Sequence, residues 1–308
     1  MKYFHKAVLL KELVEALLWN IDGIYVDGTI GEGGHAEAIS SLLSQNAEFI
    51  GIDKDDTVIE VARERLKDKK PKISIFSDSY SNLGTILESL HIKKVHGIYL
   101  DLGLSQRQIA LSEKGFSYQK QGPLDMRYDR KSSITASEIV NNYSAEELTM
   151  VFKRGGEVRG ARNLVKKIVE ERKNKLFEDT MQLSNFIEKY VGFKHALKVK
   201  KQVFQALRIE TNNELRELGK FLDSIHEYLI PDGRLAIISY HSLEDRLIKI
   251  WGRNSTAKCL CPPDALYCSC GTVPKFENLS KSAIKPLPEE VEENSSAHSA
   301  HLRVFKKV

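Results

Sequence analysis

A glycine-rich turn between a predicted strand and a predicted helix constrains the fold of this chain more than any other feature. An apolar run ends at Asp27, and the sequence Gly28-Thr29-Ile30-Gly31-Glu32-Gly33-Gly34-His35 follows it. The next apolar run ends at Asp53, 20 residues after Gly33. Glycines in such a turn let the backbone approach a ligand closely, and an acid at the tip of the second strand can accept the hydroxyls of a ribose. The pattern therefore predicts a nucleoside site in an α/β sheet.

The spacing of the glycines favours one class of nucleoside. The turn reads G-x-x-G-x-G-G rather than the dinucleotide fingerprint G-x-G-x-x-G, and Asp27 stands directly before it. Without the pyrophosphate pattern, a nucleoside that carries no phosphates fits better than NAD, and S-adenosylmethionine is the leading candidate. A turn that binds no ligand is the alternative, because glycine turns are common in α/β folds.

Strand and helix patterns alternate along residues 24–101. After the runs that end at Asp27 and Asp53, apolar runs at 73–76 and 95–101 predict a third and a fourth strand. The alternation predicts an α/β fold with a parallel sheet and helices on both faces. Ligands of such sheets bind at the carboxyl ends of the strands. The residues expected there are Asp27, Asp53, Asp78, Tyr80 and Asp101.

The alternation stops after residue 105. Residues 106–204 show only helical and polar patterns, and a further apolar strand pattern appears at 234–239. We therefore expect a Rossmann-like domain formed by residues 1–106 and 207–308, interrupted by an inserted all-helical subdomain at residues 107–206.

Composition narrows the class of protein. The chain has 308 residues, of which 42% are hydrophobic and 29% charged, as in a globular protein. No apolar run reaches the roughly 18 residues of a membrane helix and no signal-peptide pattern opens the chain. We therefore expect a soluble cytoplasmic protein without a membrane partner. Residues 1–19 read as an amphipathic helix, and residues 289–299 read as a polar loop.

Charge is distributed unevenly along the chain. The net charge is +4, but residues 151–203 contain 14 Lys or Arg and 6 Asp or Glu, so this block carries +8 and the remainder carries −4. A basic block on a mildly acidic body favours a polyanionic partner, RNA or DNA. The alternative is a pair of solvated helices whose charges only maintain solubility.

Asp101 is the candidate for the chemical step. It ends the fourth predicted strand, and Leu102-Gly103-Leu104-Ser105 follows it as a turn. Methyl transfer to an exocyclic amine needs an acceptor for an N–H proton and an aligned approach of the reacting atoms, and an acid at this strand end can provide the acceptor. Ser105 is a second candidate acceptor. The alternative is a carboxylate that only caps the turn.

The strand pattern at 234–239 leads into Tyr240, His241 and Ser242. Ser242 and Asp245 match a capping box, so Ser242 is expected to cap the next helix. For Tyr240 and His241 two roles remain open, which are stacking on a base and accepting the amine proton.

All four cysteines lie within one short segment, as the two C-x-C pairs Cys259/Cys261 and Cys268/Cys270. Four thiolates are a zinc ligand set, although C-x-C pairs are tighter than the usual knuckle. The alternative is four reduced thiols that pack a small loop. No metal ligand is predicted for the catalytic site, and His35 is expected in the first turn of a helix rather than on a metal.

Several further short motifs are spread over nearly the whole chain. Besides the glycine turn and residues 101–105, they include Gly122-Pro123-Leu124-Asp125-Met126-Arg127, Phe204-Gln205-Ala206-Leu207-Arg208-Ile209 and His241-Ser242-Leu243-Glu244-Asp245-Arg246. Together these segments resemble the small-subunit ribosomal RNA methyltransferase H family, also called MraW. The Pro-Leu-Asp-Met-Arg and His-Ser-Leu-Glu-Asp-Arg stretches are far more specific than a glycine turn.

The resemblance implies a class I (Rossmann-like) methyltransferase sheet with an inserted all-helical subdomain. It implies N4-methylation of a cytidine in the decoding region of small-subunit (16S) ribosomal RNA, with S-adenosylmethionine as donor. The expected partner is the ribosomal RNA or the assembled small ribosomal subunit, and the chain is expected to be a monomer or a homodimer. The cofactor contacts implied are Gly33, Gly34, His35, Asp53, Tyr80, Asp101 and Gln108. The catalytic candidates are Asp101, Ser105, Tyr240 and His241.

Two other functions compete with this one. An NAD-dependent oxidoreductase is disfavoured by the glycine spacing. A non-catalytic RNA-binding protein with a vestigial nucleoside pocket is disfavoured by the acids at the strand tips.

Overall fold

The computed structural model describes residues 7–105, 108, 112–262, 265 and 267–308, which form two compact units. The first unit comprises Met1–Gly103 and Leu215–Val308, and the second comprises Leu104–Glu214. The sequence predicted the insertion at 107–206. No helix among the described residues has the length and apolar character needed to cross a membrane.

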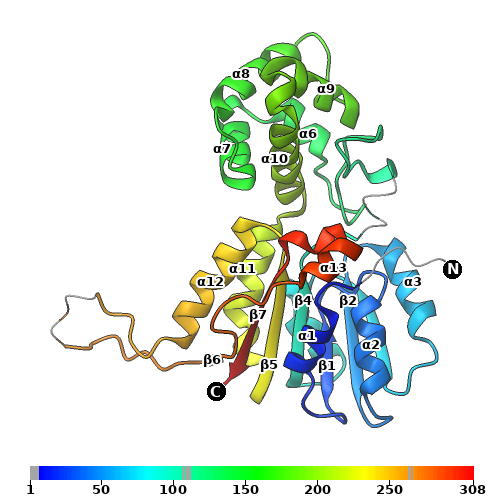
Figure 1. Ribbon diagram of the computed structural model, residues 1–308, viewed down its shortest axis with the longest axis vertical. Coiled ribbons are helices and arrows are strands. Elements are labelled where there is room, and N and C mark those ends of the chain that lie inside the picture. Colours follow the sequence, from blue (N-terminus) through cyan, green and yellow to red (C-terminus); the bar gives the residue numbers. More distant parts are fainter. Residues whose placement is uncertain (1–6, 106–107, 109–111, 263–264, 266) are drawn as a thin grey trace. The chain divides into compact units, whose positions relative to one another are not determined.

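A seven-stranded sheet forms the centre of the first unit (Figure 1). Its order is β3-β2-β1-β4-β5-β7-β6; the first five of these strands are parallel, and β7 runs antiparallel to both of its neighbours. The carboxyl ends of β1 to β5 therefore meet at one edge, and the predicted parallel sheet is confirmed. The strands are β1 (Ile24–Asp27), β2 (Glu48–Asp53), β3 (Lys72–Ser77), β4 (Val95–Asp101), β5 (Leu229–Ser239), β6 (Phe276–Asn278) and β7 (His301–Lys307).

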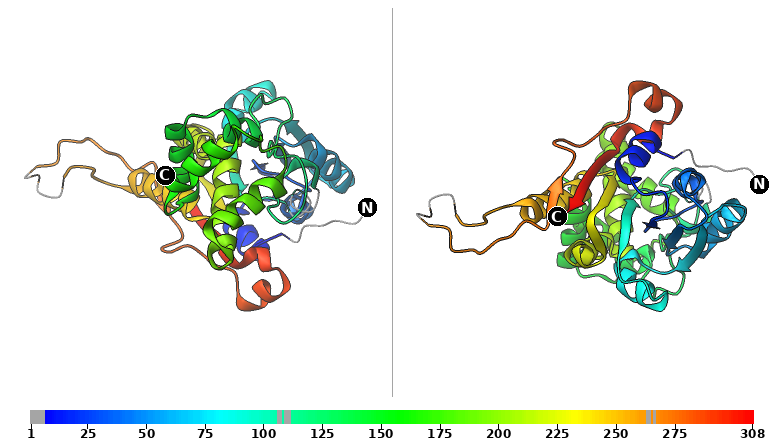
Figure 2. Two further views of the ribbon diagram at one scale, coloured as in Figure 1. Left: turned by 90° about the horizontal axis from the view of Figure 1, so that it is seen from above. Right: turned by 90° about the horizontal axis from the view of Figure 1, so that it is seen from below.

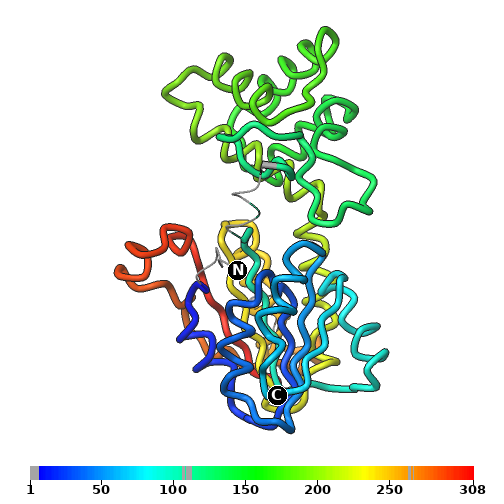
Figure 3. Tube along the Cα trace, turned by 90° about the vertical axis from the view of Figure 1, so that its right-hand side faces the viewer, coloured from blue at the N-terminus to red at the C-terminus, as the bar shows by residue number. Residues whose placement is uncertain are grey.

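Helices cover both faces of this sheet, as the trace in Figure 3 also shows. Alternate residues of a strand face opposite sides, so Tyr25 packs in one core and Val26 in the other. One face is covered by α1 (Leu10–Leu17), α2 (Gly34–Leu42), α3 (Asp56–Leu66), α13 (Pro288–Glu293) and η4 (Ser295–Ser299). The other face is covered by α4 (Leu83–Ser89), α11 (Glu214–Ser224), η3 (Ile225–Glu227) and α12 (Ser242–Thr256).

The described part of the second unit is helical, as predicted, around its own apolar core. Thr135 and Ser144 begin two of its helices with capping boxes. A Cβ on Gly156 would lie 2.3 Å from Gln202 O, so this glycine permits the close packing of two helices. The elements are η2 (Ser112–Lys114), α6 (Ala136–Asn142), α7 (Ala145–Gly156), α8 (Ala161–Glu171), α9 (Thr180–Val191) and α10 (Phe193–Asn212).

Two predicted segments near the ends of the chain differ from the structure: the first is confirmed only in part, as α1, and the second was wrong. The helix expected over residues 1–19 begins only at Leu10, because Leu9 has a φ of +54°, which an α-helix cannot continue through; residues 1–6 lie outside the described residues. The loop expected over residues 289–299 instead contains α13 and η4. Glu290 Oε1 of α13 accepts a hydrogen bond from Leu9 N at 2.7 Å, a contact between distant segments that local polarity does not reveal.

Candidate active site

The turn after β1 is fastened to the strands on both sides of it. Gly28 N donates to Tyr99 O on β4, and Ile30 N donates to Ile52 O on β2, each at 2.9 Å. A Cβ on Gly28 would lie 2.3 Å from Leu100 Cδ2 and 3.0 Å from Tyr80 Cβ, so a larger residue there would force these side chains to move. The turn is therefore held rigidly at the edge where the parallel strands end.

Glycine backbone leads from this turn into α2. Gly31 and Gly33 have φ angles of +51° and +80°, in the region that L side chains rarely adopt. Gly33 is the N-cap of α2 and Gly34 is its first residue, so the unpaired N–H groups of a helix N-terminus stand next to the strand ends. Two of the predicted cofactor residues thus lie where a ligand can come close to the backbone.

Asp27 ends β1 with a buried carboxyl group. Oδ1 accepts from Thr29 N at 3.0 Å, and Oδ2 accepts from the Tyr99 hydroxyl at 2.5 Å. Burial raises the pKa of Asp27 to about 8, and the charges of Asp101 and Asp53 contribute to the rise. Asp27 is consequently an internal support of the turn.

Asp53 ends β2 and also binds the turn. Its Oδ2 accepts from Gly31 N and its Oδ1 accepts from Asp55 N, both at 2.9 Å. Burial raises the pKa of Asp53 to about 6, although these hydrogen bonds limit the rise. An ionised carboxylate accepts about four hydrogen bonds, so both oxygens retain acceptor capacity for ribose hydroxyls.

Asp101 ends β4 with one oxygen that lacks a partner. Its backbone N donates to Thr29 Oγ1 at 2.7 Å, and its Oδ2 lies 3.5 Å from His35 Nδ1. The side chain is only 11% exposed, and the buried Oδ1 has no hydrogen-bond partner among the described residues. Buried acceptors are rarely left unpaired in proteins, so this atom marks a place where a ligand donor fits.

Tyr240, directly after β5, lies close to Asp101. Burial raises the pKa of the Tyr240 hydroxyl well above its usual range, and the Asp101 carboxylate raises it further. A Cβ on Gly103 would lie 2.8 Å from Tyr240 Cε2, so the ring packs against the turn that follows β4. The structure therefore brings Tyr240 and Asp101 together.

His35 connects the strand edge with the N-terminal segment. It is buried in the first turn of α2, as predicted, with Nε2 at 2.8 Å from Val8 O and its ring edge-on to Tyr99. The Val8 carbonyl can only accept, so Nε2 carries a hydrogen, and Nδ1 faces Asp101. His35 thus lies between the N-terminal segment and the Asp101 carboxyl group.

Tyr80 opens η1 (Tyr80–Asn82) after β3, beside the glycine turn. A Cβ added to Gly28 would lie only 3.0 Å from the Cβ of Tyr80, so the two residues are adjacent. The ring of Tyr80 packs edge-on against Phe221, with the ring centroids 5.5 Å apart. A flat, half-buried ring next to the turn suits contact with a purine. Adenine contact by Tyr80 remains a prediction.

Glu217 of α11 organises the same edge and was missed by the sequence analysis. It accepts hydrogen bonds from the hydroxyls of Ser79 and Ser81 and lies 3.3 Å from Lys54 Nζ. Burial alone would raise the pKa of Glu217, but these partners lower it on balance. It joins the loops after β2 and β3 from more than 130 residues away, a separation at which no local sequence pattern could identify it.

The predicted cap of α12 was wrong: His241 is the N-cap, not Ser242. His241 Nδ1 accepts from Glu244 N at 3.3 Å, and Glu244 Oε2 accepts from the backbone N of His241 and of Tyr240. His241 Nε2 lies 2.9 Å from Glu244 Oε1. Glu244 is buried, and the capping box is therefore formed by His241 and Glu244, one residue before the Ser242 and Asp245 pair that the Ser-x-x-Asp pattern indicated.

Ser105 and Gln108 belong to the second unit and bind each other. Ser105 N donates to Gln108 Oε1 at 3.0 Å, and Gln108 N donates to Ser105 Oγ at 3.1 Å. Both are buried. The pair fixes the start of the insertion, and its predicted roles in cofactor binding and catalysis remain predictions.

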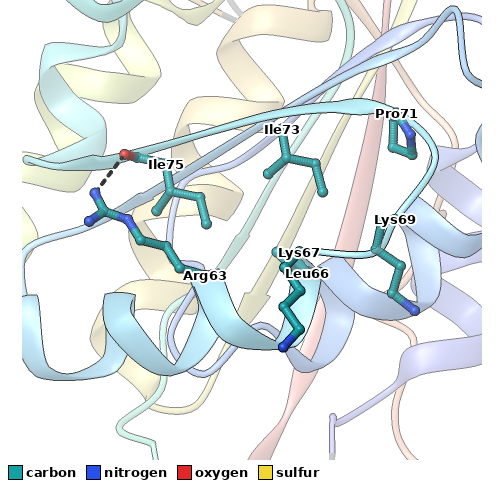
Figure 4. A pocket seen from close by; sticks show the side chains of 7 residues that line it. All are labelled: Arg63, Leu66, Lys67, Lys69, Pro71, Ile73 and Ile75. Atoms are coloured by element: carbon teal, nitrogen blue, oxygen red, sulfur yellow. Dashed lines mark hydrogen bonds between the residues drawn. The ribbon is translucent and has the colours of Figure 1, made fainter.

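A pocket of about 360 Å³ lies elsewhere in the first unit, between α3 and the edge strand β3 (Figure 4). Arg63 closes one side of it by donating to Ile75 O at 3.4 Å. None of the lining residues stands at the carboxyl end of a strand, so this pocket is separate from the site described above. The lining residues are Arg63, Leu66, Lys67, Lys69, Pro71, Ile73 and Ile75.

Known proteins resemble this chain over its whole length. It is 43% identical to the ribosomal RNA small subunit methyltransferase H of Halothermothrix orenii, with 99% of this chain and 98% of that protein covered. It is 42% identical to the enzyme of the same name from Clostridium botulinum strain Loch Maree, with 100% of both covered.

Solved structures of methyltransferases also align with the chain. An rRNA methylase of Streptococcus thermophilus matches at 13% identity and a TM-score of 0.39, over 97% of this chain and 93% of that one. A SAM-dependent O-methyltransferase of Thermotoga maritima matches at 10% identity and a TM-score of 0.40, over 97% of this chain and 63% of that one.

The model of the MraW methylase family matches residues 2–308. The chain therefore belongs to the MraW methylase family, and it is a class I methyltransferase with S-adenosylmethionine as its cofactor.

Proposed function

We propose that this protein methylates the N4 amine of a cytidine in the decoding region of small-subunit ribosomal RNA. The relatives of H. orenii and C. botulinum are named ribosomal RNA small subunit methyltransferases, and they align over nearly their full lengths. The observation that carries the chemistry is the unpartnered, buried Oδ1 of Asp101 at the end of β4. An acceptor of this kind is what an amine donor requires.

The residues at the strand ends fit S-adenosylmethionine. We assign the ribose hydroxyls to Asp53, whose two oxygens each keep acceptor capacity, and the adenine to the ring of Tyr80. Gly33 and Gly34 admit the cofactor close to the N-terminus of α2. The carboxyl groups at this edge also favour a ligand with a positive charge, and a sulfonium has one. His35 and Gln108 complete the proposed set.

When bound, S-adenosylmethionine supplies an electrophilic methyl group on a positively charged sulfur. Because that group is already activated, the protein needs an acceptor for an amine proton rather than a strong base. Asp101 either accepts this proton, or it binds the cofactor's amino group while the hydroxyl of Ser105 or Tyr240 accepts a hydrogen bond from the amine and the proton passes to solvent. His241 is the weaker candidate, because both of its ring nitrogens face Glu244.

The second unit provides a surface for RNA. Lys166, Lys173 and Lys198 are exposed there. Arg172 is different, because its two Nη atoms donate to the carbonyls of Val140 and Tyr143.

Lys200 is also engaged within the unit, by pairing with Glu188. We therefore assign phosphate contacts to the exposed lysines rather than to the whole basic block.

The experiment that tests this function uses ribosomal RNA and small subunits from a strain that lacks the enzyme. The purified chain is incubated with each substrate and methyl-labelled S-adenosylmethionine, and the nucleosides are then analysed by mass spectrometry. We expect N4-methylcytidine at one position of the decoding region, and at least ~10²-fold slower labelling with Asp101→Asn.

Label on another atom or in another rRNA region would contradict the proposed specificity. RNA binding without any transfer, by a chain that still binds the cofactor, would instead indicate the non-catalytic RNA-binding protein.

A further inference from the structure

The chain between α12 and β6 extends away from the sheet in the views of Figures 1 and 2. None of its described residues from 257 to 275 is buried, so no apolar core holds this arm together. Segments too small to bury a core are usually held by a disulfide or a metal ion. All four cysteines of the chain lie in this arm, and all four are free thiols.

The four sulfur atoms converge on one point of the arm. The Sγ atom of Cys259 lies 3.5 Å from that of Cys268 and 3.8 Å from that of Cys270, and the latter two are 3.7 Å apart. All four sulfurs, that of Cys261 included, lie within 4.8 Å of one another. With Zn–S bonds of about 2.3 Å, the sulfurs of a tetrahedral site are about 3.8 Å apart, whereas a disulfide requires about 2.0 Å. The separations therefore match four ligands of one ion.

Backbone N–H groups point at these sulfurs from both pairs. Leu260 N, between the first two cysteines, donates to Cys270 Sγ at 3.3 Å, and Ser269 N, between the last two, donates to Cys261 Sγ at 3.4 Å. Thr272 Oγ1 also donates to Cys270 Sγ, at 3.0 Å. Each C-x-C turn thus supports a sulfur of the other, and such donors stabilise the negative charge of metal-bound thiolates.

We propose that Cys259, Cys261, Cys268 and Cys270 bind one structural zinc ion that holds this arm together. Four sulfurs in a tetrahedral arrangement favour zinc or a single iron, and a set of four protein ligands leaves no open position for a substrate. Binding converts the four thiols to thiolates and releases their protons. The role is therefore to fix the path of the chain between α12 and β6.

Metal analysis of the full-length chain tests this proposal without measuring methyl transfer, so its outcome is independent of the proposed function. The wild type, purified after growth with zinc, is expected to contain about one zinc ion per chain. The double variants Cys259→Ser/Cys261→Ser and Cys268→Ser/Cys270→Ser are each expected to lose it. The matched control is Ser269→Ala, in the same arm, whose side chain is not a ligand and whose backbone N–H is retained.

A second measurement on the wild type avoids any dependence on how the variants fold. Removal of the metal by a chelator should make the thiols reactive toward a disulfide reagent, and added zinc should protect them again. Cobalt(II) in place of zinc should give the visible spectrum of a tetrahedral thiolate site.

Failure of the wild type to take up zinc, unchanged zinc content in both double variants, or uptake of iron alone would each overturn the proposal.

Discussion

Three carboxyl groups at the ends of adjacent strands cannot all be ionised without mutual repulsion. Asp27, Asp53 and Asp101 end β1, β2 and β4, which are neighbours in the sheet. The structure resolves the conflict by burying Asp27, the middle one, whose pKa rises to about 8. The proton is thus held on the residue that supports the turn, and Asp101 keeps an unpartnered oxygen for the chemistry.

The first prediction concerns the pH dependence of stability. In the unfolded chain Asp27 ionises with the ordinary aspartate pKa of 3.8, whereas in the folded chain its pKa is raised to about 8 and it stays protonated up to that pH. Between these values the folded state binds more protons, so this residue makes the free energy of unfolding fall as pH rises, by at most about 1.4 kcal/mol per pH unit. Asp27→Asn should flatten that slope between pH 5 and pH 8 in urea denaturation experiments. Equal slopes for the wild type and the variant would show that Asp27 is ionised when folded.

The second prediction concerns Asp101. Asp101→Asn keeps the size of the side chain but removes its charge, and turnover should fall by at least ~10²-fold, as on losing one transition-state contact. The melting temperature should change little, because Oδ1 has no hydrogen bond to lose among the described residues. Asp22→Asn, an exposed acid at the opposite end of β1, is the control and should retain full turnover.

Calorimetry with S-adenosylmethionine separates the two roles of Asp101. Unchanged cofactor affinity in Asp101→Asn would indicate that the carboxylate accepts the amine proton, and weakened affinity would indicate that it positions the cofactor. Near-normal turnover by a folded variant would place the chemistry at another residue.

At the scale of elements, the start of α12 differs from its sequence pattern in a testable way. Glu244→Ala removes the acceptor for the backbone N of Tyr240 and of His241, and we expect a loss of about 1–3 kcal/mol in the free energy of unfolding. Ser242→Ala leaves both members of the capping box in place and should therefore lower it less than Glu244→Ala does. Urea denaturation of both variants measures the difference. A larger effect of Ser242→Ala would restore the cap indicated by the sequence.

The sequence predicted those elements whose signal is local. Apolar runs ending in Asp27, Asp53 and Asp101 located three parallel strands, and parallel strands necessarily bring their ends to one edge. Glu217 could not be found this way, because its partners lie in loops far away along the chain. The polar helix α13 was missed for the same reason, since its contact with Leu9 is not local.

The cysteine arm shows the same limit. Two C-x-C pairs are compatible with zinc or with free thiols, and only the separation of the sulfurs in space distinguishes these alternatives. His241 was misassigned for a different reason: Ser-x-x-Asp is a good local pattern, but the buried position of Glu244 selects the box one residue earlier.

At the scale of the whole molecule, residues proposed for chemistry and residues proposed for RNA affinity lie largely in different units. The strand-end acids belong to the first unit, and the exposed lysines of α8 and α10 belong to the second. Variants in the second unit should therefore weaken RNA binding without changing the affinity for S-adenosylmethionine.

The last prediction tests this division. Replacing Lys173 and the exposed α8 and α10 lysines Lys166 and Lys198 with alanine should remove up to three phosphate contacts, and each contact contributes about 0.7–0.9 to the slope of log affinity against log salt concentration. We therefore expect weaker RNA binding and a slope lower by about 2. The matched control replaces exposed lysines near the amino ends of β3 and β4, at positions 70, 93 and 94, and removes the same charge. If RNA affinity and its salt dependence fall equally in both triple variants, RNA binding depends only on the net charge of the protein. The exposed lysines of the second unit are then only a solvated face.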